Sequence, residues 1–250
     1  MDAIVLAGGL NSGALRKVSP AQYEAEIEVA GRPMLEYVIS ALSAVSRVQR
    51  IIVVAPDIKL SPEIKSKVSA LAPPGKNMIE SLNNGIKALN TTEPVLVISS
   101  DIPLITPEAL NDFLDQCTRR QGDVYYPVVR KETNEEKYPG VQRTYVKLRE
   151  GTFTGGNLVL LSPRIIQNNM EMLTKAVMLR KKPLQLCAML GLHYLFYLLI
   201  GRLTIRDIEK RISKSFLFTG VGIISTYPEV GIDVDKPSDL QLAARVLSGR

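Results

Sequence analysis

Two groups of aspartates stand at the ends of apolar segments that are typical of buried strands. Asp101 follows the apolar residues 95–98, and Asp233 and Asp235 lie at the end of a second such segment, residues 230–234. Alternation along a strand would place Asp233 and Asp235 on the same side. Open α/β sheets bind ligands at the carboxyl ends of their strands, and Mg²⁺ commonly takes one or two carboxylates together with phosphate oxygens of the substrate. The alternative role of Asp101, as the cap of the next helix, is already filled by Thr106. One carboxylate from each group can therefore hold a Mg²⁺ ion.

A glycine-rich loop follows the first apolar segment, residues 4–7. It begins with Gly8 and Gly9, whose backbone N–H groups can approach an anion closely. Arg16 and Lys17 lie in the same loop and can neutralise a triphosphate. The spacing matches neither the dinucleotide-binding fingerprint nor the P-loop, so a plain glycine turn with two solvated bases stays open as the alternative.

Apolar strands and amphipathic helices alternate in the first half of the chain. Strands are predicted at residues 4–7, 51–55 and 95–98, and helices are predicted to begin at Pro33, at Ser81 and after Thr106. Short, continuously apolar strands with helices between them are typical of a parallel sheet that is covered on both faces.

The second half of the chain has a different pattern. Strands are predicted at residues 124–129, 141–148, 158–161, 221–226 and 230–234, with a polar loop at 130–137 and a closing helix that begins at Pro237. A helical segment separates the later strands at about residues 163–216. We expect one α/β domain over residues 1–250 that carries this segment as a basic, apolar helical insertion.

Composition limits the chemistry that the chain can perform. Its 250 residues include one histidine, which excludes zinc sites built on two or three imidazoles. Cys117 and Cys187 are too far apart in the sequence for a CxxC pair, and the N-terminal residues lack the pattern of a signal peptide. We therefore expect a cytoplasmic protein whose chemistry rests on carboxylates, bases, hydroxyls, backbone amides and a hard metal ion.

Four segments, taken in order, resemble the nucleotidyltransferases typified by molybdenum cofactor guanylyltransferase and the sugar-1-phosphate pyrophosphorylases. They are residues 6–9 (LAGG), 29–38 (VAGRPMLEYV), 101–104 (DIPL) and 233–240 (DVDKPSDL). Residues 77–85 are also similar to the family segment that reaches the base and the ribose. The resemblance covers about residues 1–162 and 220–248 and leaves the helical insertion outside it.

The resemblance implies a Rossmann-like fold of the GT-A type, with a mixed, mostly parallel sheet flanked by helices. It implies Mg²⁺-dependent transfer of a nucleoside monophosphate from an NTP to a phosphorylated small-molecule or lipid-linked acceptor, with release of pyrophosphate. Asp101 and Asp235 would bind Mg²⁺, and Asp101 and Arg16 would be catalytic. The residues implied to bind the nucleotide are Leu6, Ala7, Gly8, Gly9, Lys17, Asn77, Ser81 and Asn84, and those implied to lie beside the acceptor are Gly155, Gly156 and Asn157.

One position departs from the family pattern. Glu24 stands where the family usually has a lysine that helps to bind the phosphates, and a carboxylate there would repel a triphosphate. Either Arg16, Lys17 or Lys236 supplies the charge, or the donor differs, or the protein is a nucleotide-binding regulator that has lost catalysis. A GT-A glycosyltransferase that uses a nucleotide-sugar is a further alternative, because it would use the same phosphate site and Asp101.

The positive charge of the chain is concentrated in the helical insertion. Residues 164–214 carry ten Lys or Arg and three acidic residues, in a chain of net charge +6. Within them, residues 184–200 are apolar apart from Gln185 and His193, and one helix of that length spans about 25 Å, less than the roughly 30 Å hydrocarbon core of a bilayer.

Two interpretations of this segment stay open. In the first, its apolar helix packs on the sheet or on a second copy of the chain in a homodimer. In the second, residues 180–214 contact a membrane surface or a lipid-linked acceptor. Aromatic residues are not interleaved with the bases, so we expect no nucleic-acid partner.

Overall fold

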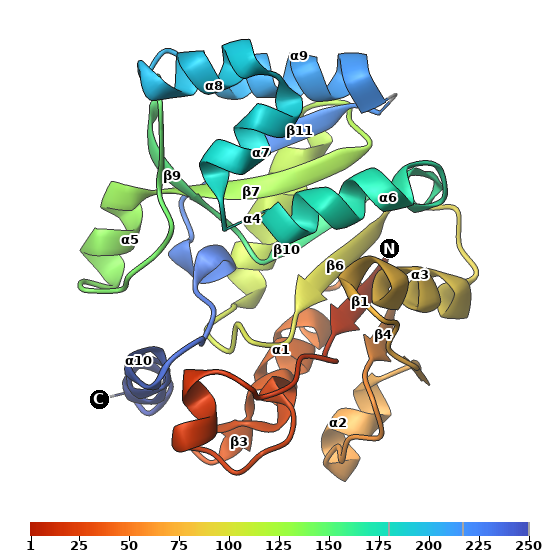
Figure 1. Cartoon of the computed structure of the whole chain (residues 1–250). Coiled ribbons are helices and arrows are strands. Elements are labelled where there is room, and N and C mark those ends of the chain that lie inside the picture. The colour runs from red at the N-terminus through yellow and green to blue at the C-terminus, as the bar shows by residue number, and fades with distance from the viewer. Residues whose placement is uncertain (180, 217, 250) are drawn as a thin grey trace.

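One mixed sheet runs through the part of the chain that the computed structural model describes, residues 1–179, 181–216 and 218–249. Its strands are β1 (Asp2–Leu6), β4 (Arg50–Val54), β5 (Ala70–Ala72), β6 (Val95–Ser99), β7 (Val124–Arg130), β8 (Val146–Leu148), β9 (Gly151–Gly155), β10 (Leu158–Leu161) and β11 (Gly220–Ser225). Their order is β5-β4-β1-β6-β10-β7-β9-β8, and β11 pairs with β7 (Figure 1). The strands from β5 to β6 are parallel, β10 is antiparallel to both β6 and β7, and β11 is parallel to β7.

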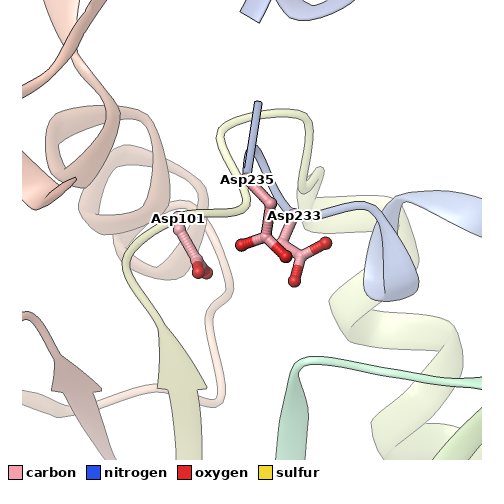
Figure 2. A group of neighbouring side chains, drawn as sticks. All are labelled: Asp101, Asp233 and Asp235. Carbon is pink, nitrogen blue, oxygen red and sulfur yellow. The ribbon is translucent and has the colours of Figure 1, made fainter. Parts of the chain in front are cut away.

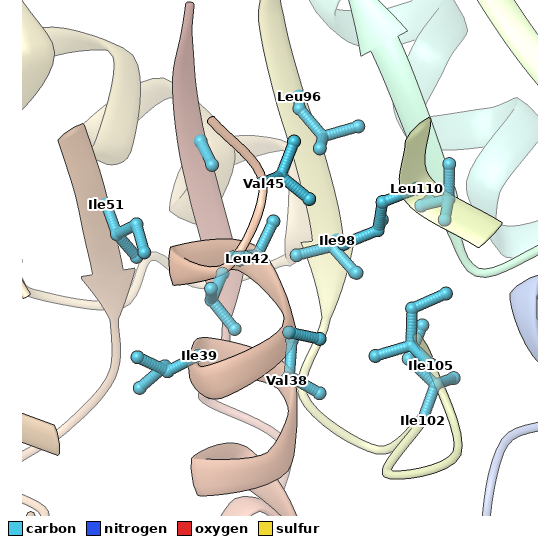
Figure 3. Packing of buried hydrophobic residues seen from close by; sticks show 14 of the residues in the cluster. Val38, Ile39, Leu42, Val45, Ile51, Leu96, Ile98, Ile102, Ile105 and Leu110 are labelled. Carbon is cyan, nitrogen blue, oxygen red and sulfur yellow. The ribbon is translucent and has the colours of Figure 1, made fainter. Parts of the chain in front are cut away.

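Helices cover both faces of the sheet. Ala3 and Val5 of β1 are buried in a cluster with one pair of helices, and Ile4 between them is buried with the other pair, which is the two-residue period of a strand. The first pair is α1 (Met34–Ser43) and α4 (Pro107–Thr118), and the second is α3 (Met78–Leu89) and α6 (Arg164–Leu179). Figure 3 shows Val38 and Leu42 of α1 close to Ile98 of β6 in this core.

The remaining elements lie outside these two pairs of helices. The helices are α2 (Pro62–Lys67), α5 (Lys131–Lys137), α7 (Pro183–Leu190), α8 (Leu192–Leu199), α9 (Ile205–Phe216) and α10 (Pro237–Leu247). The short 3₁₀ turns are η1 (Ala14–Lys17), η2 (Glu24–Glu26) and η3 (Pro228–Gly231), and β2 (Glu28–Val29) pairs with β3 (Arg32–Pro33) as a small ribbon.

Two predictions around the second half of the sheet are wrong. Residues 130–137 were expected to form a loop but contain α5, because their Lys and Glu residues are good helix formers and Lys131 pairs with Glu135 one turn later at 3.3 Å. The strand expected at 141–148 is limited to β8.

The strand expected at residues 230–234 is also absent. Pro228 begins η3 instead, and the residues after η3 are extended without a strand partner. Backbone groups of residues 230–234 form hydrogen bonds with other loops. The Val230 carbonyl accepts from Asn157 N at 2.7 Å, and Val234 N donates to the Asp101 carbonyl at 2.9 Å. Tertiary contacts therefore satisfy this segment in place of a sheet ladder.

The apolar segment 184–200 is not one helix. Gly191 has φ +134° and ψ 147°, a conformation that breaks the segment into α7 and α8, which pack against each other. No helix among the described residues has the length and apolar character that a transmembrane span needs. Arg180, the first residue of the basic stretch 180–214, lies outside the described residues.

Gly156 lies in the turn between β9 and β10, where three chain segments meet. A Cβ at this position would lie 2.7 Å from Pro127 Cγ and 3.0 Å from the Val230 carbonyl oxygen. Pro127 and the Val230 backbone have little freedom to move, so only glycine allows this approach. Because Val230 leads into the segment that carries Asp233 and Asp235, the packing of Gly156 helps to place those carboxylates.

Gly156→Ala should lower the free energy of unfolding by about 1–3 kcal/mol, the usual cost of overpacking a rigid contact. Urea denaturation measures the change. Gly13→Ala is the matched control, because a Cβ at Gly13 has no neighbour within 4 Å. Equal stabilities for the two variants would contradict this account of Gly156.

Candidate functional site

Three carboxylates converge at the carboxyl edge of the sheet. Asp101 follows β6, and Asp233 and Asp235 lie between η3 and α10, yet each offers an oxygen within 4.8 Å of the others (Figure 2). The hydrogen bond from Val234 N to the Asp101 carbonyl joins the two segments directly. The sequence placed Asp101 and Asp235 together, and the structure adds Asp233 to the same cluster.

The cluster lies beside the glycine loop at the point where the strand order reverses. The chain passes from β1 to β4 on one side and later returns to β6 on the other, and parallel sheets bind ligands at such a switch point. The Ser100 N–H donates to the Leu6 carbonyl at 3.2 Å, which holds the loops after β6 and β1 together. The two sequence motifs therefore share one site.

Each aspartate of the cluster contacts a polar side chain. Ser99 donates its hydroxyl to Asp101, Arg143 forms an ion pair with Asp233, and Lys181 Nζ lies 2.5 Å from Asp235 Oδ2. Asp233 is buried, Asp101 is partly buried and Asp235 is exposed. Burial raises the pKa of Asp101 above its usual value and the charge of Asp235 adds to this shift, whereas the Ser99 hydrogen bond opposes it.

A fourth carboxyl group, that of Glu24, lies at the same site. The Glu24 N–H donates to the Gly9 carbonyl at 2.9 Å, and its side-chain Oε2 would lie 2.9 Å from a Cβ built on Gly9. Burial, followed by the charges of Asp101 and Asp235, raises the pKa of Glu24 from 4.5 to about 7. Glu24 is therefore part of the site electrostatically, and its carboxylate adds to the repulsion between the aspartates.

The glycine loop presents free backbone donors. Gly8 and Gly9 are exposed, and among the hydrogen bonds of the described residues none uses their N–H groups. Arg16 donates to the carbonyl groups of Pro20 and Ala21 at 2.6 and 2.8 Å, so its guanidinium closes the loop. Lys17 is exposed and has no ion pair within the described ranges.

The polar residues of α3 hold a neighbouring loop. Asn77 caps the helix by accepting from Glu80 N. Ser81 accepts from the Gly75 N–H at 2.9 Å, and Asn84 donates to the Pro73 carbonyl at 3.0 Å. The loop that they secure packs against Gly8, where a Cβ would lie 3.2 Å from Pro74 Cβ. Asn77, Ser81 and Asn84 thus shape the wall beside the glycine loop in this structure.

The residues expected beside the acceptor lie in the β9–β10 turn. A Cβ on Gly155 would lie 2.3 Å from the Tyr126 hydroxyl, which also donates to the Gly156 carbonyl at 2.9 Å. Asn157 connects this turn to the cluster, because its carbonyl accepts from Ser99 N at 3.0 Å. Its side-chain Nδ2 is buried and has no hydrogen-bond partner within the described chain.

Sequence reasoning missed two cations of the site. Arg143 was missed because the sequence predicts a strand at 141–148 and carries no motif at this position, whereas β8 begins only at Val146. Lys181 was assigned only to the basic face of the insertion. Its position beside Asp235 depends on how the turn between α6 and α7 packs, for which the sequence carries no signal.

Replacing Glu24 with Gln should change stability in a pH-dependent way. The folded-state pKa of about 7 lies above the unfolded value of 4.5, so protonated Glu24 favours the folded state below pH 4.5 and this stabilisation is lost as the pH rises through 7. In metal-free buffer, Glu24→Gln should therefore raise Tm by a few degrees at pH 8 and leave it unchanged at pH 4.

Glu26→Gln, in the same turn η2, provides the control and should show no such pH dependence relative to wild type. Differential scanning fluorimetry across pH 4–8 is sufficient for the comparison. A Glu24→Gln variant that tracks the Glu26→Gln variant at every pH would contradict the proximity of Glu24 to the aspartates.

Comparison with known proteins identifies relatives of this chain. Residues 3–197 match the MobA-like NTP transferase domain family, so the match includes α6, α7 and part of α8, which the motif resemblance had left outside. A hypothetical transferase from Thermus thermophilus is 36% identical, with a TM-score of 0.83 over 96% of this chain and 98% of that one. No curated protein gave a significant match.

More distant structures share the fold. A CMP:2-keto-3-deoxy-manno-octonic acid synthetase complexed with CTP is 12% identical, with a TM-score of 0.62 over 99% of this chain and 98% of that one. The molybdopterin-guanine dinucleotide biosynthesis protein A from Archaeoglobus fulgidus is 13% identical, with a TM-score of 0.55 over 100% of both chains. The predicted Rossmann-like fold with a mixed, mostly parallel sheet is therefore confirmed. Because the family match spans well over half of its length, the chain belongs to the MobA-like NTP transferase family of nucleotidyltransferases.

Proposed function

We propose that this protein transfers a nucleoside monophosphate from an NTP to a phosphorylated small-molecule or lipid-linked acceptor and releases pyrophosphate, with Mg²⁺ as the cofactor. The observation that carries the proposal is the convergence of Asp101, Asp233 and Asp235 beside the free N–H groups of Gly8 and Gly9. A nucleotidyltransferase needs both features, because it must hold a divalent cation and a polyphosphate in contact with each other.

The donor set of the cluster fits Mg²⁺. All three side chains offer carboxylate oxygens, the hard ligands that this ion prefers, and the exposed position of Asp235 leaves the cluster open to solvent. When bound, the ion would offset the negative charge of the phosphates. Asp101 and Asp235 would hold the ion. Asp233, which is buried and paired with Arg143, would contribute negative charge near the ion.

The reaction itself requires correct positioning of the two substrates more than it requires proton transfer. An acceptor phosphate oxygen attacks the α-phosphorus of the NTP, the new P–O bond forms, and the bond to the β-phosphate oxygen breaks with its electron pair leaving on pyrophosphate. The nucleophile is already an oxyanion, so no general base is required. The N–H groups of Gly8 and Gly9 would bind phosphate oxygens, and Asn157 Nδ2 would donate to the acceptor.

Two alternatives use the same site. A GT-A glycosyltransferase would release a nucleoside diphosphate from a nucleotide-sugar, and a nucleotide-binding regulator would bind an NTP without turnover. Analysis of the product distinguishes the three activities, since only nucleotidyl transfer yields pyrophosphate. The Glu24 carboxylate is the observation that favours the regulator.

Asp101→Asn should lower the rate of NTP-dependent pyrophosphate release at least about 100-fold, comparable to the loss of one strong electrostatic contact in an active site. A thermal-shift panel of the four NTPs with Mg²⁺ first selects the donor, and pyrophosphate release is then followed over a panel of sugar, polyol and lipid phosphates. Asp115→Asn is the control, because this aspartate lies on α4 and forms an exposed ion pair with Arg47. Equal rates for wild type and Asp101→Asn would refute the assignment of Asp101.

The proposal includes a membrane partner for the helical insertion. The inner sides of α7 and α8 bury Cys187 and Leu198 against β8 and β9, whereas Leu192, Phe196 and Leu199 of α8 are 77, 58 and 65% exposed. These outward side chains belong to the segment that holds the positive excess of the chain. An apolar face among bases fits an anionic lipid surface, on which a lipid-linked acceptor would also lie.

Sedimentation with phospholipid vesicles tests this contact. Wild-type protein should bind vesicles that contain phosphatidylserine, should not bind phosphatidylcholine vesicles, and should dissociate at high salt. Phe196→Ser with Leu199→Ser should reduce the binding at least tenfold. A wild-type homodimer that this double variant dissociates, or vesicle binding that the variant leaves unchanged, would refute the membrane contact.

A further inference from the structure

The three basic residues that the sequence offered as phosphate partners, Arg16, Lys17 and Lys236, are engaged elsewhere or extend into solvent. Arg16 is held by two carbonyl groups of its own loop, and Lys236 Nζ donates to Gln142 Oε1 at 3.0 Å. Lys17 is exposed on η1 and has no ion pair within the described residues. Glu24 occupies the position at which the family resemblance leads us to expect a lysine. A nucleotide triphosphate bound at this loop would need positive charge from another part of the chain.

Lys181 brings that charge to the site from the helical insertion. It lies in the turn between α6 and α7, far from the glycine loop in sequence, yet its Nζ is 2.5 Å from Asp235 Oδ2. Its charge also opposes the upward shift in the pKa of Glu24 and of Asp101. The ammonium group is therefore within electrostatic range of carboxyl groups on both sides of the site.

The ion pair between Lys181 and Asp235 contributes little to the stability of the fold. The two side chains are 57 and 42% exposed, and ion pairs at such exposure are worth about 0–1 kcal/mol. Loss of the lysine should leave the packing of α6 and α7 unchanged, since its charged group pairs at the surface with an exposed aspartate. The stability of the fold therefore does not explain why a cation is placed among these carboxylates, whereas the binding of an anionic ligand does.

We infer that Lys181 is the phosphate-binding cation of this site and contacts the triphosphate of the NTP, in place of a lysine at position 24. The inference rests on the proposed nucleotidyl transfer, because that function requires the triphosphate at the glycine loop. Asp235 holds the ammonium at the cluster before the nucleotide arrives, so less of the conformational freedom of this long side chain is lost on binding. The insertion is in this way part of the nucleotide site.

NTP binding and turnover of Lys181 variants test the inference separately. Lys181→Ala should weaken the affinity for the NTP selected with Mg²⁺ about 10- to 30-fold, measured by isothermal titration calorimetry without acceptor, and should raise KM for the NTP accordingly. Its Tm without nucleotide should equal that of wild type. Lys181→Arg should retain most of the affinity, because it keeps the charge. Lys182→Ala is the matched control, since Lys182 is exposed and has no carboxylate partner among the described residues.

A second variant returns the cation to the family position. Adding Glu24→Lys to Lys181→Ala should restore at least tenfold of the lost affinity, because the new ammonium replaces the lost one and the repulsive carboxylate is removed. NTP affinity equal to wild type in Lys181→Ala, a loss of the same size in Lys182→Ala, or no recovery in the double variant would each overturn the inference.

The two proposals fail in different ways. If wild type binds the NTP and Lys181→Ala weakens that binding, but no acceptor yields pyrophosphate, then nucleotidyl transfer is refuted and the role of Lys181 in binding phosphate stands. If wild type releases pyrophosphate and Lys181→Ala does so with the same KM, then the inference on Lys181 is refuted and the proposed function stands.

Discussion

Carboxyl groups from three distant parts of the chain, Glu24, Asp101 and the pair Asp233 and Asp235, share one edge of the sheet, where burial and mutual repulsion raise the pKa of Glu24 and Asp101. Side-chain attraction cannot bring such groups together, so the backbone does. The Asp101 carbonyl accepts from Val234 N at 2.9 Å, and the Leu6 carbonyl accepts from Ser100 N at 3.2 Å. Strongly perturbed carboxyl groups held in this way are typical of sites that bind cations or perform catalysis.

The cations of the site come from the second half of the chain. Arg143 precedes β8 and pairs with the buried Asp233, and Lys181 follows α6 and pairs with the exposed Asp235. The parallel half of the sheet thus supplies the glycine loop and Asp101, and the later segments supply the partners of the remaining aspartates. The helical insertion connects these roles, because the turn between α6 and α7 reaches the carboxylates while α8 presents apolar side chains to solvent.

Local sequence patterns predicted the first half of the fold better than the second. Residues 3–5 of β1, 51–54 of β4 and 95–98 of β6 are apolar and buried, and Thr106 caps α4 as expected, with its side chain accepting from Ala109 N at 3.2 Å. Residues 130–137 and 230–234 were assigned wrongly for two reasons. The first segment is polar enough for a loop but rich in helix formers, and the second is apolar because Val230 and Val234 are buried against loops and a helix, not because they form a strand.

The sequence by itself determined the order of the strands and helices of the first half, the glycine loop and the acidic end of β6, because these follow from hydrophobic periodicity, glycine conformation and short motifs. Only the tertiary structure decided that Asp233 joins the cluster, that Arg16 closes its own loop, and that Lys181 reaches Asp235. Contacts of this kind depend on how turns far apart in the chain pack against one another, and no local pattern of residues records that packing.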